Sequence, residues 1–174
     1  EHPDCVVVAT PPRSHAEVCL LAIDNGCDVI CEKPFMTSVS EVDAVIQAAA
    51  RAGKAVAVNH EFREMPIFRS VLDAVAAEGR EKIVFAQAWQ QVDLPPSAEH
   101  GWRQSETKGV LHEAGVHLID YMMAVFGCAP HSVIASMSGA AHGEPRDSIA
   151  SLSLQFPHGK SASIVINRLA KGEN

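Results

Sequence analysis

The sequence contains no long hydrophobic run and no excess of positive charge. None of its apolar stretches approaches the roughly 18 residues that a membrane-spanning helix needs. Lys and Arg number 14 against 21 Asp and Glu, which gives a net charge of −7. Because nucleic acids and anionic membranes attract basic proteins, this balance argues against both as main partners. We therefore expect a globular protein whose main partner is neither nucleic acid nor membrane.

Cysteine is sparse and forms no recognisable motif. The five cysteines occur in apolar stretches that predict strands or helices, and they are Cys5, Cys19, Cys27, Cys31 and Cys128. An odd number of cysteines without a Cys-x-x-Cys pair is typical of free thiols, not of a disulfide framework. We interpret them as reduced core thiols of a cytoplasmic protein.

The sequence also lacks the turn Gly-x-Gly-x-x-Gly that holds the pyrophosphate of a dinucleotide. It does not begin with methionine, and the first predicted strand, 5–9, follows almost at once. A parallel strand so close to a terminus would lack neighbours. We therefore expect these residues to be an internal piece of a longer protein.

Residues 1–60 show the alternation of a parallel βαβαβ unit. Strands are predicted over 5–9, 29–31 and 55–58, and helices over 15–25 and 38–52. The first strand is apolar throughout, which predicts cover on both faces. Ser14 and Glu17 have the spacing of a capping box at the first helix.

Residues 61–174 have a different pattern, which predicts an α+β domain. Helices are predicted over 66–77 and 111–126, and strands over 82–92, 132–138, 148–156 and 161–167. A hairpin signal at 157–160 joins the last two strands, so we expect a large, mostly antiparallel open sheet. The connection 93–108 is long for a compact domain, which favours a functional role.

The most informative short motif is Glu32-Lys33-Pro34, directly after the predicted strand 29–31. Ligands of open parallel sheets bind at the carboxyl ends of the strands. A lysine at that place is partly removed from water, which suits a proton-transfer role. Pro34 restricts the backbone of Lys33 to extended or turn geometry and so aims its side chain. From the motif alone, a solvated surface turn is an equally good interpretation.

Glu113, His117 and Asp120 are spaced to lie on one face of the helix 111–126. A histidine beside a carboxylate suits general acid–base catalysis. Taken alone, an ordinary polar helix face is the more common explanation. Glycine in a helix costs roughly 1 kcal/mol against alanine, so Gly109 and Gly115 indicate that something approaches the backbone closely.

Two further patterns are weaker. Thr10-Pro11-Pro12 and His15 stand at a strand end and a helix start, where free amides attract anions, although a simple turn explains them equally well. The spacing of His112 and His117 does not match the zinc-protease helix, which needs two histidines four residues apart. We predict no metal site.

Several motifs together resemble a known family. They occur in its order and spacing, and they are Val6–Pro12, His15, Glu32–Pro34, Asn59–Arg63, Trp102-Arg103 and Gly109–Asp120. The chain resembles the Gfo/Idh/MocA oxidoreductases over essentially its whole length. The resemblance implies a partial Rossmann domain over residues 1–60, which binds NAD or NADP and has its glycine-rich turn upstream of Glu1. It also implies a substrate-binding and oligomerisation domain over residues 61–174, which ends beyond Asn174.

The resemblance also assigns roles to single residues. Lys33 and His117 match the catalytic positions. The cofactor-binding positions are Thr10, Pro11, His15, Glu32, Lys33 and Pro34. The substrate positions are Arg63, Trp102, Arg103 and Glu113. The family usually has aspartate where Glu113 stands, and it often places an arginine before the aromatic residue where this chain has Phe62-Arg63.

These observations predict a nicotinamide-dependent dehydrogenase that acts on a secondary alcohol of a sugar, polyol or related compound. We expect a homo-oligomer that forms through the open sheet. One alternative is a catalytically silent protein that binds dinucleotide as a sensor or regulatory partner. A second is a free-standing interaction domain, if the 174 residues are the whole protein. The presence of both Lys33 and His117 favours the enzyme.

Overall fold

The structure is a computed structural model that describes residues 3–93, 109–139 and 147–170. The chain divides into two compact units, Glu1–His60 and Glu61–Asn174. Among the described residues, no helix has the length and apolar character needed to cross a bilayer. The predicted loop 93–108, apart from Asp93, lies outside the described residues.

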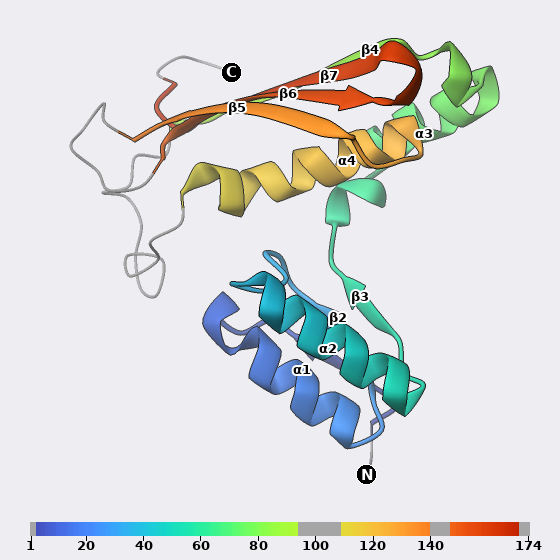
Figure 1. The fold of residues 1–174 in the computed structure, drawn as a ribbon, viewed down its shortest axis with the longest axis vertical. Helices are drawn as coiled ribbons and strands as arrows, with labels where there is room; N and C mark the ends of the chain where they lie inside the picture. Colours follow the sequence, from blue (N-terminus) through green and yellow to red (C-terminus); the bar gives the residue numbers. More distant parts are fainter. Residues whose placement is uncertain (1–2, 94–108, 140–146, 171–174) are drawn as a thin grey trace. The chain divides into compact units, whose positions relative to one another are not determined.

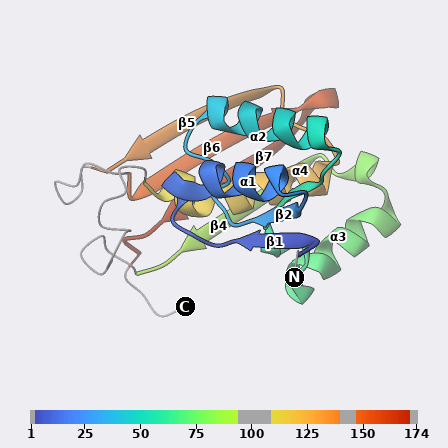
Figure 2. The same ribbon diagram turned by 90° about the horizontal axis from the view of Figure 1, so that it is seen from below.

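The first unit is a parallel three-stranded sheet with two helices on one face (Figures 1 and 2). The strands are β1 (Cys5–Val8), β2 (Asp28–Cys31) and β3 (Val56–Val58), and the helices are α1 (His15–Asp24) and α2 (Val39–Ala52). Val8, Val29 and Val45 are among the side chains that form the core between sheet and helices. The predicted βαβαβ unit is confirmed.

The prediction that the first strand is covered on both faces is wrong within this structure. Val7 on β1 is 67% exposed, and Ile30 on β2 is 40% exposed. In the described part of this unit, the sheet face opposite α1 and α2 therefore carries bare apolar side chains. A continuous apolar run records residue types, and it does not say which segments of the chain lie against them.

The capping box forms at α2 and not at α1. The Ser38 hydroxyl accepts a bond from the amide of Glu41, and Glu41 accepts one from the amide of Ser38. Ser14 instead donates to the hydroxyl of Thr10 and the carbonyl of Pro11. Because Ser14 ends a 3₁₀ turn, its backbone lacks the extended conformation that an N-cap usually has.

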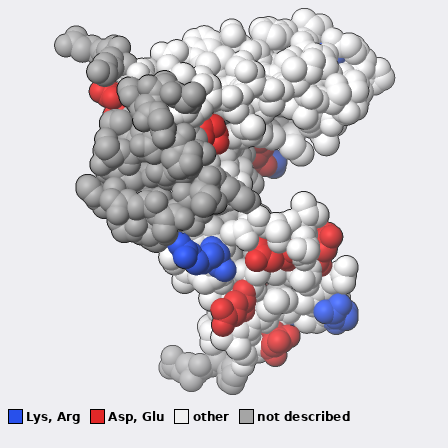
Figure 3. Space-filling view, turned by 60° about the vertical axis from the view of Figure 1, so that its left-hand side comes forward, with Lys and Arg blue, Asp and Glu red and all other residues white. Residues whose placement is uncertain are grey.

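The second unit is a four-stranded mixed sheet with one face packed on helix α4 (Val116–Phe126) (Figure 1). The order is β4 (Phe85–Gln91), β7 (Lys160–Asn167), β6 (Ile149–Phe156) and β5 (Ser132–Ser138). β4 is parallel to β7, and the other two pairings are antiparallel. The predicted, mostly antiparallel sheet is therefore confirmed. Figure 3 shows that the visible surface of this unit carries few charged side chains.

Aromatic and aliphatic side chains fill the space between the sheet and α4. Phe126 stacks on Phe156 with ring centroids 4.2 Å apart, and Ile164 and Ile166 of β7 are fully buried in the same core. Helix α3 (Pro66–Glu78) contributes Val75 to the same core. This core holds α4, and with it His117, firmly on the sheet.

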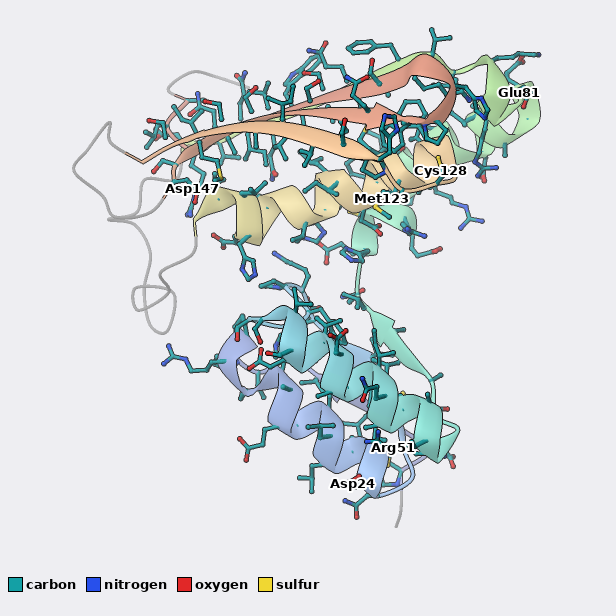
Figure 4. All side chains as sticks on the ribbon, viewed as in Figure 1. Asp24, Arg51, Glu81, Met123, Cys128 and Asp147 are labelled. Atoms are coloured by element: carbon teal, nitrogen blue, oxygen red, sulfur yellow. The ribbon has the colours of Figure 1, made fainter. Side chains whose placement is uncertain are left out.

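The helix predicted over 111–126 begins with a π turn, Leu111–Gly115. A Cβ atom on Gly109 would collide with Asp147, and one on Gly115 would lie 2.7 Å from a methyl group of Leu111. The close approach predicted at these glycines is confirmed, but the chain's own side chains make it. Figure 4 shows Asp147 at the start of this helix, where its carboxylate accepts a bond of 2.9 Å from the amide of Leu111.

All five cysteines are free. Cys19, Cys27 and Cys31 are buried as predicted, whereas Cys5 and Cys128 are exposed, so the prediction of core thiols is wrong for these two. Cys5 belongs to the bare face of the first sheet, and Cys128 follows the end of α4.

Candidate active site

Lys33 lies in the turn after β2, at the carboxyl end of the parallel sheet, and is partly buried. Its peptide bond to Pro34 is cis. The neighbouring Glu32 is held at both oxygens: one accepts a bond of 2.6 Å from the side-chain amide of Asn59, and the other lies 3.2 Å from the backbone nitrogen of Lys33. Asn59 follows β3, so adjacent strand ends hold the turn together.

His15 connects this turn to the preceding strand end. Its side chain is 0% exposed. Nδ1 lies 3.1 Å from the carbonyl oxygen of Pro34 and 3.0 Å from that of Phe35, while Nε2 lies 2.7 Å from the carbonyl oxygen of Thr10. The ring thus has both nitrogens engaged inside the protein. These contacts join the turns that carry Thr10 and Lys33, and the cofactor-binding role of His15 stays a prediction.

The two turns fit part of a dinucleotide. Thr10 is exposed, Pro11, Glu32 and Lys33 are partly exposed, and Pro34 is buried. Hydroxyl, carboxylate, ammonium and backbone groups at the ends of parallel strands suit the sugar and amide groups of such a ligand. Thr10, Pro11, Glu32, Lys33 and Pro34 would hold it, and this role stays a prediction for each of them.

In the second unit, His117 lies against the 3₁₀ turn Glu61–Arg63 and is 5% exposed. Its ring stacks on Phe62 with centroids 4.6 Å apart and planes inclined by 16°. Phe62 stacks in turn on Phe68 with centroids 4.4 Å apart. The Nε2 atom of His117 lies 4.0 Å from a carboxylate oxygen of Glu61. A buried imidazole between an aromatic ring and a carboxylate suits acid–base chemistry, and the catalytic role of His117 stays a prediction.

Glu113, predicted to contact substrate, is bound by a side chain that the sequence analysis missed. Arg168, only 6% exposed, follows the end of β7 and donates from Nη1 to Glu113 at 3.1 Å. The cation compensates the carboxylate and restrains its orientation. No local motif marked Arg168, because only the pairing of β6 and β7 places the strand end beside the π turn.

The predicted substrate residue Arg63 forms a bidentate pair with Asp120. Its Nε and Nη2 atoms lie 2.6 and 2.7 Å from the two carboxylate oxygens. Hydrogen bonding to Asp120 raises the pKa of Arg63 above its ordinary value, so the guanidinium stays charged. The pair anchors the 3₁₀ turn to α4. Trp102 and Arg103, the other predicted substrate residues, lie outside the described residues.

The Arg168–Glu113 pair gives a first prediction. In a double-mutant cycle with Arg168→Met and Glu113→Gln, we expect a coupling free energy of about 1–2 kcal/mol, because one partner is buried. Urea unfolding of the single and double variants measures it. The exposed pair Arg69–Glu64, with a similar separation of 3.2 Å, is the control and should give a value near zero. Equal coupling free energies in both pairs would contradict the conclusion that Arg168 holds Glu113 in place.

Comparison with family models agrees with this arrangement of two units. Residues 1–60 match the oxidoreductase family model with an NAD-binding Rossmann fold, and residues 68–174 match the GFO/IDH/MocA C-terminal domain.

Curated proteins show the same relationship. The chain is 32% identical to 1,5-anhydro-D-fructose reductase of Ensifer adhaerens over 145 residues. This alignment covers 81% of this chain and 43% of that protein. It is 27% identical to scyllo-inositol 2-dehydrogenase (NADP(+)) IolW of Bacillus subtilis over 164 residues. This alignment covers 93% of this chain and 45% of that protein. The chain thus spans about half the length of the curated relatives it matches.

Solved structures share the fold. An NAD-binding protein from Listeria innocua has a TM-score of 0.81 at 24% identity, over 98% of this chain and 50% of that one. GenD2 from gentamicin A biosynthesis, solved in complex with NAD, has a TM-score of 0.84 at 21% identity, over 98% and 49%. Since both family models match and their ranges leave only residues 61–67 uncovered, the chain belongs to the Gfo/Idh/MocA family of oxidoreductases.

Proposed function

We propose that the protein is an NAD- or NADP-dependent oxidoreductase that acts on a secondary alcohol of a sugar, polyol or related compound. The observation that carries the proposal is Lys33, held by its turn at the carboxyl end of the parallel sheet in the segment that matches an NAD-binding family. The names of three relatives support the substrate class: 1,5-anhydro-D-fructose reductase, D-glucoside 3-dehydrogenase and scyllo-inositol 2-dehydrogenase.

In this proposal each unit supplies one proton-handling group. The bound nicotinamide supplies the hydride acceptor or donor. Either Lys33 or His117 takes the hydroxyl proton of the alcohol, and the other polarises its oxygen. The buried ring of His117 is held by Phe62, which limits the reorganisation that a proton transfer needs. Glu113 and Arg63 are the proposed substrate contacts.

Turnover on the full-length protein tests the proposal. NAD and NADP are each offered with inositols, glucosides and 1,5-anhydro sugars, and reduced nicotinamide is followed by absorbance. We expect turnover with at least one cyclic polyhydroxy compound. Tight dinucleotide binding by calorimetry without turnover on this panel would instead support the silent sensor.

The free thiols support a cytoplasmic location for this enzyme. All five cysteines are unbridged, and Cys19 and Cys31 are buried hydrogen-bonding neighbours. The hydrogen bond with Cys19 and burial raise the pKa of Cys31, so its thiol stays protonated. Reduced thiols of this kind persist where glutathione and thioredoxin act.

We also propose that the open face of the second sheet forms a homo-oligomer interface. The strand registers place uncharged side chains throughout this face. Its members are Phe85, Gln87, Trp89, Gln91, Ser132, Ile134, Ser136, Ser138, Ile149, Ser151, Ser153, Gln155, Ser161, Ser163, Val165 and Asn167. Serines are frequent on this face, while Trp89 on one edge strand is 62% exposed and Ile134 on the other is 73% exposed. An uncharged sheet face with exposed apolar side chains suits an isologous contact with a second copy.

A charge at the centre of this face should prevent assembly. We expect the full-length protein to be a dimer or a larger oligomer, and Ser163→Arg to shift it toward monomer because an unpaired charge would be buried. Light scattering at tens of micromolar measures the mass. Ala77→Arg, on the exposed surface of α3, is the control and should leave the mass unchanged. A monomeric parent protein would rule the interface out.

A further inference from the structure

Two carboxylates in the second unit are placed to act on His117. Glu113 precedes it by four residues on the same helical segment, and Glu61 approaches from the 3₁₀ turn. The family resemblance assigns a role in the site to Glu113. The contacts in the structure instead indicate Glu61, whose carboxylate oxygen lies 4.0 Å from Nε2 of His117.

The surroundings of Glu113 reduce its electrostatic effect on His117. Arg168 binds the carboxylate at 3.1 Å and is 6% exposed, so a positive charge lies directly beside the negative one. The field of such a pair falls off faster than that of a single charge. Glu61 is 47% exposed at its side chain, and among the described residues the ion pair found for it is with His117.

The turn that carries Glu61 is rigidly attached to α4. On one side Arg63 forms its bidentate bond with Asp120. In the middle Phe62 lies between the rings of His117 and Phe68. The hydroxyl of Tyr121, one turn further along α4, donates to the carbonyl of Phe68 at 2.9 Å. These contacts fix the backbone of Glu61 relative to the imidazole of His117.

We propose that Glu61 is the positioning carboxylate of His117. It stabilises the ring when the ring carries the extra proton. Glu113, four residues before His117, is the other carboxylate that could have this role. The separation of 4.0 Å exceeds a hydrogen bond, so Glu61 acts on the ring through its charge. The inference rests on the proposed function only in assuming that His117 exchanges the proton.

The charges around His117 within this unit set the sign of the expected effect. Among the described residues they include Glu61 and Arg63 on the 3₁₀ turn, Glu113 and Asp120 on the helical segment, and Arg168 at the end of β7. The contacts pair Arg63 with Asp120 and Arg168 with Glu113. Removal of the Glu61 charge should therefore disfavour the imidazolium and lower the pKa of His117.

Histidine NMR tests this directly. The full-length protein is labelled at the histidine rings and titrated as parent, Glu61→Gln and Glu113→Gln, with His117→Ala to assign the signal. We expect Glu61→Gln to move the His117 midpoint to lower pH, and Glu113→Gln to move it less. Glu61→Asp should restore part of the difference. A midpoint that Glu61→Gln leaves unchanged, or that Glu113→Gln moves as much or more, would overturn the proposal.

The pH profile of turnover separates this proposal from the proposed function. In an active protein, the limb of the kcat profile that belongs to His117 should move to lower pH in Glu61→Gln. If His117→Ala retains full turnover, the catalytic role of His117 fails, while the NMR midpoints still decide whether Glu61 is its partner. If the midpoints respond as expected and the kcat limb does not move, Glu61 is not a positioning residue for catalysis.

Discussion

Replacement of either Lys33 or His117 by alanine should lower kcat of the full-length protein by about 10²–10⁴-fold, the usual contribution of a general acid or base. Dinucleotide affinity should remain nearly unchanged in His117→Ala, because that residue belongs to the segment that matches the C-terminal domain. Steady-state kinetics and calorimetry measure the two quantities. Glu113→Gln should have a smaller effect, mainly on KM.

Two matched variants control this experiment. Lys54→Ala removes a lysine of the first unit that follows α2, and His131→Ala removes an exposed histidine of the second unit. Both should keep the parent kcat. Near-parental turnover in Lys33→Ala and His117→Ala together would show that the active site is misplaced. Loss of dinucleotide binding in His117→Ala would show that the roles of the two units are wrong.

His15→Ala should lower the free energy of unfolding of the first unit by about 2–4 kcal/mol. The change opens a cavity at a site that is 0% exposed, and it removes the partner of three carbonyl oxygens. Hydrogen exchange at the amides of β1 and β2 measures the loss within that unit. Because the same contacts hold the turn of Lys33, kcat should fall as well.

Two variants separate packing from hydrogen bonding in this prediction. His15→Phe fills the space and removes the bonds, so it should restore part of the stability but not kcat. Ile23→Val, at another buried site of α1, should cost about 0.5–1.5 kcal/mol and leave kcat unchanged. If His15→Phe matches the parent in both stability and kcat, the carbonyl contacts have no positioning role.

Local patterns were sufficient for much of the fold because their causes are local. Apolar runs alternate with helical patterns through residue 58. This alternation predicted the strands and helices of the first unit, and parallel pairing of β1, β2 and β3 assembles them into one sheet. The strand predicted over 132–138 has those same bounds in the structure. The capping box failed at Ser14 because the motif specifies residue types, whereas the backbone that a cap needs depends on the preceding turn.

The sequence by itself determined the family and its two candidate catalytic residues, through several short motifs in a fixed order along the chain. It also determined the elements that carry them, because periodicity and turn residues act over one or two turns of chain. Only the tertiary structure decided which partners these residues have. Arg168 reaches Glu113 across 55 positions, Arg63 reaches Asp120 across 57, and His15 reaches Phe35 across 20. Such contacts arise from packing and strand register, which bring together segments that no local pattern relates.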